Sequence, residues 1–560
     1  GISSSLVPAF LCHSTMIGET STYPLVDPTT FDLVILGTGL PAAVISAAAS
    51  AIGKSVLHLD PNPFYGSSFS SLPPDELSSY LKSQHAAASD TTSRPPLSPN
   101  SGCPTLDIRT SPVYSHFETL LHSPEPMELS RKFNLDLSGP RVLFCAGSAV
   151  DLLLKSGASQ YLEFKSVDAS LVLGSDGQFW KVPDSRAATF TEPSLAPLEK
   201  TRLTRFFNTA HKHLASYASE NNEALRISQE DLESPFVEFM EKKGLTPKII
   251  SAILYATAMV DHDQDDMNCS KDMIKTKDGI DRLALYQSSV GRFKNASGAL
   301  IYPIYGQGEL SQAFCRRAAV KGCLYVLRMP VIALLLDQGR KHCVGVKLIS
   351  DQDIFCQKLV MDPCFMAQMP LASDSPDFMR IIPTPENSNA KVARSICIIR
   401  GSLSLHRNVS NILVVYPPKS LYPEQVTSIR ALQIGKDLAV CPPGMFVLYL
   451  SALCDGADQG KKILNTAIHA LLSYSDSGDV NNTEAAAKPT LLWSALYIQE
   501  LTMGFQNPFE SIHFTPLPDG NIDYDDVLEA TKKLFQEMYP HEEFFPEMPV
   551  SDNLEDDEGA

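Results

Sequence analysis

The sequence has no uninterrupted apolar run of the roughly 18 to 20 residues that a membrane-spanning helix needs. Its longest stretch of small and apolar residues, 41–52, is too short to cross a bilayer. The N-terminus also lacks a basic segment followed by an apolar one, so no secretory signal is indicated. Met16 is a candidate natural start, with 1–15 as an upstream remnant. We therefore expect a protein that is soluble or touches membranes only peripherally.

Basic clusters and paired cysteines are also missing. The 46 Lys and Arg residues form no local cluster, and with 64 Asp and Glu residues the net charge is -18. Such a chain repels a phosphate backbone, so nucleic acid is excluded as a partner. The acidic surface could attract a basic protein segment, although net charge more often reflects solubility. The 12 cysteines include no CxxC spacing, which favours reduced thiols over disulfides or zinc, and we expect no structural metal.

Common catalytic motifs are absent too: there is no GxSxG, HExxH or phosphate-binding loop. The segment 261–266 (DHDQDD) has acids at the first, third and fifth positions of a calcium loop. However, Asp266 replaces the required glycine and Asp272 replaces the final glutamate. A solvated loop at a helix end is the better interpretation. We expect His58, on an apolar strand, to be structural.

The first structural pattern along the chain is a βαβ unit in 31–60, with a strand, a glycine turn, an alanine-rich helix and a second strand. Gly37, Gly39 and Ala42 match the GxGxxG/A fingerprint of dinucleotide-binding domains, and Asp60 ends the second strand about twenty residues on. The glycines allow a tight turn and close approach of a pyrophosphate, and the acid could bind a ribose hydroxyl. The same turn also permits close strand-to-helix packing without any ligand. Binding of FAD or NAD and a ligand-free architecture therefore both remain open on these residues.

Two later regions have distinctive composition. The stretch 73–128 is rich in Ser, Pro and Thr with little hydrophobic periodicity, which predicts a surface insertion. In contrast, 189–293 has mainly helical patterns. Within it Thr246 and Pro247 suit the start of a helix, and 249–260 (IISAILYATAMV) is apolar on nearly all sides, as in helices buried between partners.

Two long segments then resemble a known family. FDLVILGTGLPAAVISAAASAIGKSVLHLDPNPFYG and LIYPIYGQGELSQAFCRRAAVKGCLYVLRMPV are similar to the two signatures of the GDP-dissociation inhibitor and Rab escort superfamily. RKFNLDLSGPRVLF, DLLLKSGASQYLEFK and KVPDSRA lie between them in the family's order. The resemblance covers most of 31–330 and continues more weakly to 540. The insertion and the total length resemble the Rab escort branch. One departure is Ser67, which stands where the family pattern Tyr-Gly-Gly has its last glycine.

The resemblance implies an α/β fold: a flavoprotein-like domain of the FAD/NAD(P)-binding type with mixed sheets, plus a smaller all-helical domain. It implies no cofactor, no catalytic residue and no redox role. The expected division is an N-terminal extension 1–30, a flavoprotein-like domain in two parts, 31–188 with the insertion 73–128 and 294–545, a helical domain 189–293, and an acidic tail 546–560.

The implied partners are Rab GTPases in the GDP form, the Rab geranylgeranyltransferase and the geranylgeranyl lipid. The resemblance makes Tyr65, Glu309, Gln312 and Arg316 the expected Rab contacts, and the last three share one helical face at i, i+3 and i+7. We place the lipid shelter in the apolar helix, at Ile249, Ile250, Ile253 and Ala256. The alternatives are a recycling GDP-dissociation inhibitor and, more remotely, an FAD-dependent oxidoreductase.

Overall fold

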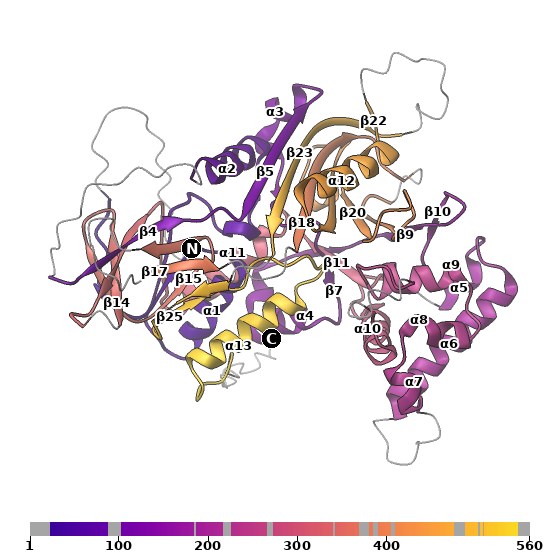
Figure 1. The fold of residues 1–560 in the computed structure, drawn as a ribbon, viewed down its shortest axis with the longest axis horizontal. Helices are drawn as coiled ribbons and strands as arrows, with labels where there is room; N and C mark the ends of the chain where they lie inside the picture. The colour runs from indigo at the N-terminus through magenta and orange to yellow at the C-terminus, as the bar shows by residue number, and fades with distance from the viewer. Residues whose placement is uncertain are drawn as a thin grey trace, which may run out of the picture.

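The structure, a computed structural model, describes most of the chain as two mixed β-sheets with helices packed on them and a separate group of helices (Figure 1). The residues described are 23–87, 102–183, 186–216, 226–265, 273–339, 342–368, 380–384, 390–404, 409–474, 488–501, 504–507 and 509–546. Most of the predicted N-terminal extension and acidic tail lie outside them.

The first sheet contains the predicted βαβ unit at its parallel end. Strands β12, β2, β1 and β15 run parallel, and β15 also pairs in parallel with β25, whereas the remaining neighbours are antiparallel. Across the sheet the strands are β12 (Leu324–Leu327), β2 (Val56–Asp60), β1 (Thr30–Leu36), β15 (Asp353–Met361), β14 (Cys343–Leu348), β13 (Val331–Leu336), β4 (Thr105–Thr110), β16 (Phe365–Gln368), β17 (Arg380–Thr384) and β24 (Gly504–Gln506), with β25 (Ile512–Phe514) beside β15.

The alternation of side chains along β1 separates two hydrophobic cores. Leu33 and Ile35 point to the face covered by helices, whereas Val34 and Leu36 point to the other face and pack with the antiparallel strands. Because both faces are covered, β1 is apolar at nearly every position. The helices on the first face are α1 (Leu40–Ala51), α11 (Gly308–Val320), α13 (Asp525–Met538) and α4 (Ser148–Ser156).

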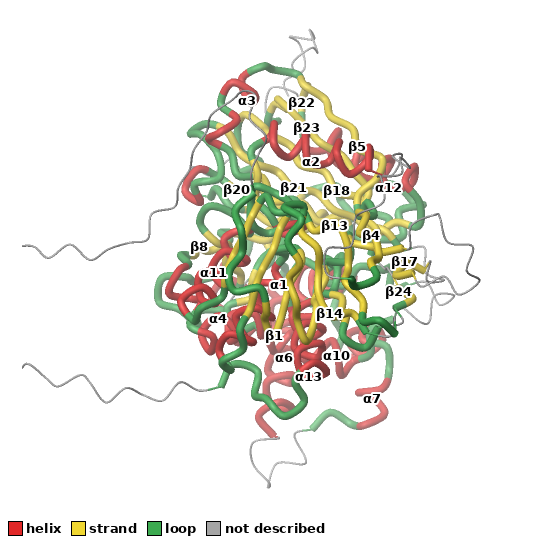
Figure 2. Tube along the Cα trace, turned by 90° about the vertical axis from the view of Figure 1, so that its left-hand side faces the viewer, coloured by secondary structure: helices red, strands yellow, loops and turns green. Residues whose placement is uncertain are grey.

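The second sheet is mostly antiparallel and packs α12 (Ala457–Leu471) on one face. Its other face belongs to a core shared with the helical group. Figure 2 shows the strands gathered through the middle of the molecule. Across the sheet they are β10 (Phe179–Lys181), β9 (Ala169–Leu173), β19 (Ile412–Tyr416), β20 (Ile429–Ile434), β21 (Met445–Cys454), β18 (Lys391–Arg400), β23 (Thr490–Glu500) and β22 (Ser473–Tyr474), with β5 (Tyr114–Leu121) also on β23.

Between 186 and 289 the described residues form helices and turns without a strand, as the sequence pattern predicts. This group lies to one side in Figure 1, away from the first sheet. It consists of α5 (Arg186–Thr191), α6 (Pro197–Ala215), α7 (Gln229–Glu233), α8 (Phe236–Lys242), α9 (Pro247–Ala252), the π-helix η6 (Ile253–Thr257) and α10 (Thr276–Ser289).

The segment that follows η6 is tied to the second sheet. Arg430 of β20 forms an ion pair with Asp261 at 2.7 Å, and Lys419 pairs with Asp263. These two acids therefore bind protein cations, and Asp263 is only 8% exposed, so the segment is tied to the sheet rather than solvated as expected. Positions 266–272 of the calcium pattern lie outside the described residues. In the part of the chain that the structure describes, no group of three or more His, Cys, Asp or Glu side chains could hold a metal ion.

The expectation of a surface insertion at 73–128 is wrong for its described part, which is built into both sheets. It contains α2 (Pro74–Ala87), β4, β5 and α3 (Glu125–Glu128), and β4 pairs with β13 and β16 while β5 pairs with β23. Leu77, Leu81 and Leu106 are fully buried. The pattern misled because β5 is an edge strand with polar residues on both faces, and its partner is far away in sequence.

Two small sheets complete the fold near the functional site. One contains β7 (Leu143–Phe144), β11 (Leu300–Pro303) and β8 (Phe164–Ser166), and the other pairs β3 (Ser71–Leu72) with β6 (Leu135–Asp136). The α/β fold class with mixed sheets and helices is confirmed. Among the described residues, no helix combines the length and the apolar character needed to cross a membrane.

Candidate functional site

The glycine turn between β1 and α1 has the shape that the fingerprint predicts. Gly37 has a φ of +93°, a conformation that side chains rarely adopt. Its carbonyl accepts a hydrogen bond from Nε2 of His58 at 2.6 Å. Burial lowers the pKa of His58 to about 4, against the opposing effect of this hydrogen bond, so the ring is neutral. His58 therefore has the structural role expected of it.

Asp60, the acid of the fingerprint, is fully engaged by protein donors. Its Oδ2 accepts from the backbone nitrogen and the hydroxyl of Thr38, at 2.8 and 2.6 Å, and from the hydroxyl of Ser67 at 3.2 Å. Its Oδ1 accepts from the backbone nitrogen of Asn62 at 2.8 Å. Burial raises the pKa of Asp60, and these hydrogen bonds oppose the shift. The carboxylate thus holds the turn that follows β2, where a dinucleotide enzyme would hold a ribose.

A second buried carboxylate fills the space beside the glycines. A Cβ placed on Gly37 would lie 2.7 Å from Cβ of Asp362, and one on Gly39 would lie 3.3 Å from its Oδ2. Gly39 also pairs with the backbone of Gly66. Burial raises the pKa of Asp362 to about 6. Two acids and a covering turn are unsuited to a pyrophosphate, which needs donors and positive potential. These residues do not fit FAD or NAD, so the fingerprint is better explained as architecture.

We therefore expect the purified protein to be colourless, with no visible absorbance from a bound flavin. The physical reason is that Asp362 and the turn around Gly66 occupy the crevice. The measurement is a visible spectrum before and after dialysis against excess FAD, with a known flavoprotein treated in parallel. Flavin retained at one equivalent per chain would overturn this explanation of the turn.

Three of the four predicted Rab contacts lie along α11. Glu309 and Gln312 are half-buried, Arg316 is exposed, and Nε2 of Gln312 donates to Oε1 of Glu309 at 3.1 Å. Burial raises the pKa of Glu309 and the charge of Arg316 opposes that shift, so these two side chains lie within electrostatic reach. Leu310, Phe314 and Ala318 on the opposite side are buried against α1 and its neighbours. The helix therefore presents one polar face outward.

Tyr65 reaches the same surface from the turn after β2. Its ring packs edge-on against Tyr325 of β12, with centroids 6.0 Å apart. Burial raises the pKa of its hydroxyl, and Arg316 is among the groups that counter this. Ser67, the departure from the family pattern, binds Asp60 and so anchors the turn that carries Tyr65. We call Tyr65, Glu309, Gln312 and Arg316 the platform; the structure brings them together, and their role in binding stays a prediction.

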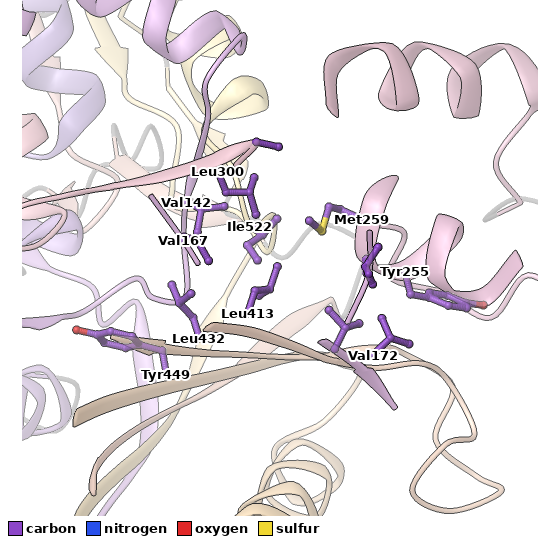
Figure 3. Close-up of a cluster of buried hydrophobic side chains, with 14 of the residues drawn as sticks. Val142, Val167, Val172, Tyr255, Met259, Leu300, Leu413, Leu432, Tyr449 and Ile522 are labelled. Carbon is purple, nitrogen blue, oxygen red and sulfur yellow. The ribbon is translucent and has the colours of Figure 1, made fainter. Parts of the chain in front are cut away.

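The residues proposed for lipid shelter are core residues in this structure. Ile249, Ile250, Ile253 and Ala256 are at most 6% exposed and belong to the core that joins the helical group to the second sheet. In Figure 3, Tyr255 and Met259 from this segment lie with Val172, Leu413 and Leu432 of the sheet. The helix is thus buried, as its all-round apolar character predicts.

A cavity next to this apolar segment is not a lipid-binding pocket in this structure. It has a volume of about 190 Å³ and lies beside Thr257, Ala258 and Met259, but Arg282 and Asp523 also line it. Pockets that enclose drug-sized ligands typically measure roughly 300 to 1,000 Å³ and are mostly apolar. A lipid among these helices would therefore require them to separate, and that step remains part of the proposal.

Sequence reasoning missed the buried carboxylates other than Asp60. Asp136 lies in the short strand β6 and Asp362 directly follows β15, and both are at most 5% exposed. A signal existed for Asp136, because an acid between Leu135 and Leu137 interrupts an apolar stretch. Their partners come from distant segments, so their contacts could not be read from the sequence.

Comparison with known proteins agrees with the geometry. The model of the GDP dissociation inhibitor family matches residues 27–94 and 99–477. Rab escort protein 1 of Arabidopsis thaliana is 51% identical over 542 residues, covering 94% of this chain and 95% of that protein. Rab proteins geranylgeranyltransferase component A of Drosophila melanogaster is 26% identical, covering 94% of this chain and 92% of the relative.

A solved structure shows the same fold. The crystal structure of a Rab GDI from Plasmodium falciparum superposes with a TM-score of 0.63 at 19% sequence identity, covering 91% of this chain and 98% of the other. At that identity the superposition establishes the fold alone.

Proposed function

The chain belongs to the GDP dissociation inhibitor family, and we propose that it acts as a Rab escort protein. In this role it binds an unprenylated, GDP-bound Rab, presents it to the Rab geranylgeranyltransferase, and carries the prenylated Rab to a membrane. The observation that carries the proposal is the 51% identity with Rab escort protein 1 along nearly the full length of both chains. The platform on α11 and the Tyr65 turn is the surface we assign to the Rab.

The proposed role is that of an accessory protein rather than an enzyme. The catalytic chemistry would belong to the transferase, and this chain would supply binding and orientation. Its flavoprotein-like domain would comprise 31–188 and 294–545, and its helical domain 189–293. The turn at Gly37 and Asp60 would serve the first domain as a rigid support for Tyr65. We assign the protein to the cytosol, with transient membrane contact during delivery.

Physical chemistry explains why a prenylated Rab needs such a carrier. Each buried methylene contributes about 0.8 kcal/mol, so a chain of about twenty carbons would cost on the order of 10 kcal/mol or more if left in water. The carrier must shelter this surface and still release it to a bilayer. We place the shelter among the helices near Ile253, which would have to part from the second sheet or from one another.

A recycling role is the nearest alternative, because a guanosine nucleotide diphosphate dissociation inhibitor of Arabidopsis thaliana is 27% identical over 425 residues. An escort protein should form a stable complex with unprenylated Rab and the transferase together. We expect gel filtration of the three proteins to give one co-eluting peak. Co-elution only after the Rab has been prenylated would favour the recycling role.

A further inference from the structure

The platform is built from two segments far apart in the chain, and one buried carboxylate joins them. Tyr65 lies before the short helix 67–69 and β3, whereas Glu309 and Arg316 lie on α11. Strand β3 pairs with β6, where Ser71 is opposite Asp136. The first turn of α11 lies against the same pair of residues. Asp136 and Ser71 therefore form a direct link between the two halves.

Asp136 accepts hydrogen bonds from both halves. Its Oδ1 accepts from the hydroxyl of Ser71 at 2.6 Å and from the backbone nitrogen of Gln307 at 3.0 Å. The same Ser71 oxygen accepts from the backbone nitrogen of Gly308 at 2.7 Å. The hydroxyl of Tyr302 donates to Oδ2. Three donors thus converge on one side chain that is 1% exposed.

The glycines before and at the start of α11 let the backbones approach this closely. A Cβ on Gly306 would lie 2.7 Å from Oγ of Ser71 and 2.8 Å from Oδ1 of Asp136. A Cβ on Gly308 would lie 2.7 Å from the backbone nitrogen of Ser71. Distances under 3.0 Å would push the helix away from β3. The spacing YGQGE thus brings the first turn of α11 into contact with the carboxylate.

The burial of this carboxylate has an electrostatic cost. Its hydrogen-bond partners are the neutral groups of Ser71, Tyr302 and Gln307, and burial raises the pKa of Asp136 to about 6 against their opposing effect. A buried charge satisfied only by neutral donors is costly. Apolar side chains at these positions would hold β3 against β6 with a smaller free-energy cost of burial. The carboxylate contributes what an apolar side chain cannot, which is a directional acceptor for two segments at once.

We propose that Asp136 is a positioning residue for Rab binding: with Ser71, it sets the N-terminus of α11 against the segment that carries Tyr65. The proposal rests on the function proposed above. It predicts that loss of this contact weakens Rab binding by displacing Glu309 and Arg316, without removing any group that touches the Rab.

The test is calorimetric titration of a GDP-loaded, unprenylated Rab into the full chain and three variants, each checked by thermal melting. Asp136→Leu removes every acceptor, and Ser71→Ala removes the link to Gly308. Coupling through a network typically changes affinity by roughly 2- to 30-fold, and we expect losses in that range for both. Asp136→Asn should stay within about twofold of wild type, since its amide oxygen can accept from Ser71 and Gln307 and its nitrogen can donate to Tyr302.

A double-mutant cycle separates positioning from general stability. In a Glu309→Ala background, Ser71→Ala should reduce Rab affinity by a smaller factor than it does in the wild type. The reason is that the Glu309 carboxylate, which Ser71 helps to position, is already absent. Asp362→Asn is the matched control, because it alters a buried carboxylate whose pKa is also raised to about 6. Any change that it makes in the free energy of Rab binding should simply add to the change made by Glu309→Ala. If Asp136→Leu does not fold, the positioning role is tested by Ser71→Ala alone and by its double-mutant cycle with Glu309→Ala.

Two contrary outcomes are distinguishable. If Arg316→Ala weakens binding but folded Ser71→Ala binds as wild type, or if the cycle is additive, the positioning role is wrong. If Arg316→Ala and Glu309→Ala also bind as wild type, the platform itself is wrong and the proposed function loses its binding surface.

Discussion

Replacing Arg316 with alanine should weaken the binding of GDP-loaded, unprenylated Rab by roughly 30-fold or more, with the fold intact. Arg316 is exposed on α11, so its loss leaves no cavity in the free protein. Its planar guanidinium can make paired hydrogen bonds to a carboxylate or to backbone carbonyls. Removing one partner of a charged contact that becomes buried typically costs about 2 to 5 kcal/mol. Calorimetric titration measures the loss directly.

The neighbouring arginine provides a matched control. Nε of Arg317 donates to the carbonyl of Ser156 at 2.7 Å, so this side chain points toward α4 rather than away from the protein. Arg317→Ala removes the same charge from the next position of the same helix. We expect it to lower the melting temperature slightly and to leave Rab affinity within about threefold of wild type, as for a charge outside the contact. Equal losses for the two variants would point to net charge rather than to the platform.

Replacing Ile253 with aspartate should destabilise the protein by about 4 kcal/mol or more, among the largest effects of any single substitution. Ile253 is 3% exposed within the core shared by the helical group and the second sheet. A carboxylate there would lose its hydration without gaining a partner. Thermal melting and denaturant titration of the variant measure the change.

Leu198→Asp is the comparison for Ile253→Asp, because Leu198 lies on α6 of the same helical group and is 60% exposed. It should change stability by less than about 0.5 kcal/mol, as surface substitutions usually do. Should Ile253→Asp melt like wild type, the helix would not be packed as the structure has it. Lipid handling is better tested with Ile253→Val, whose typical cost of about 0.5 to 1.5 kcal/mol leaves the protein folded.

The sequence predicted those parts of the fold whose signals are local. The run Leu33–Leu36, the turn at Gly37 and the alanine-rich helix specify a βαβ unit within thirty residues, and β1, α1 and β2 form there. The segment 249–260 is apolar on nearly all sides, and it is buried, although its helical part ends at Thr257. The family resemblance supplied the platform residues, and helical spacing placed three of them on one face.

What the sequence could not predict depends on contacts between distant segments. Polar residues interrupt β5 without a regular alternation, and its pairing with β23 could not be read from them. The fingerprint residues alone left cofactor binding open, and they gave no indication that Asp362, some three hundred positions further on, lies beside Gly37. Nothing in the sequence around Asp136 indicated that Ser71, Tyr302 and Gln307 are its hydrogen-bond partners. In each case the deciding partner is a tertiary neighbour, and tertiary context overrides local pattern.

The most direct test of the central proposal is transfer of labelled geranylgeranyl from its diphosphate to a GDP-loaded Rab by purified Rab geranylgeranyltransferase, with and without this protein. We expect incorporation into the Rab to depend on the protein and to level off once protein and Rab are present in equal amounts, as for a carrier that binds one Rab. Arg316→Ala should require a higher concentration to reach the same incorporation. If the transferase modifies the Rab equally well without the protein, or if the protein leaves an inactive mixture inactive, the escort function is contradicted.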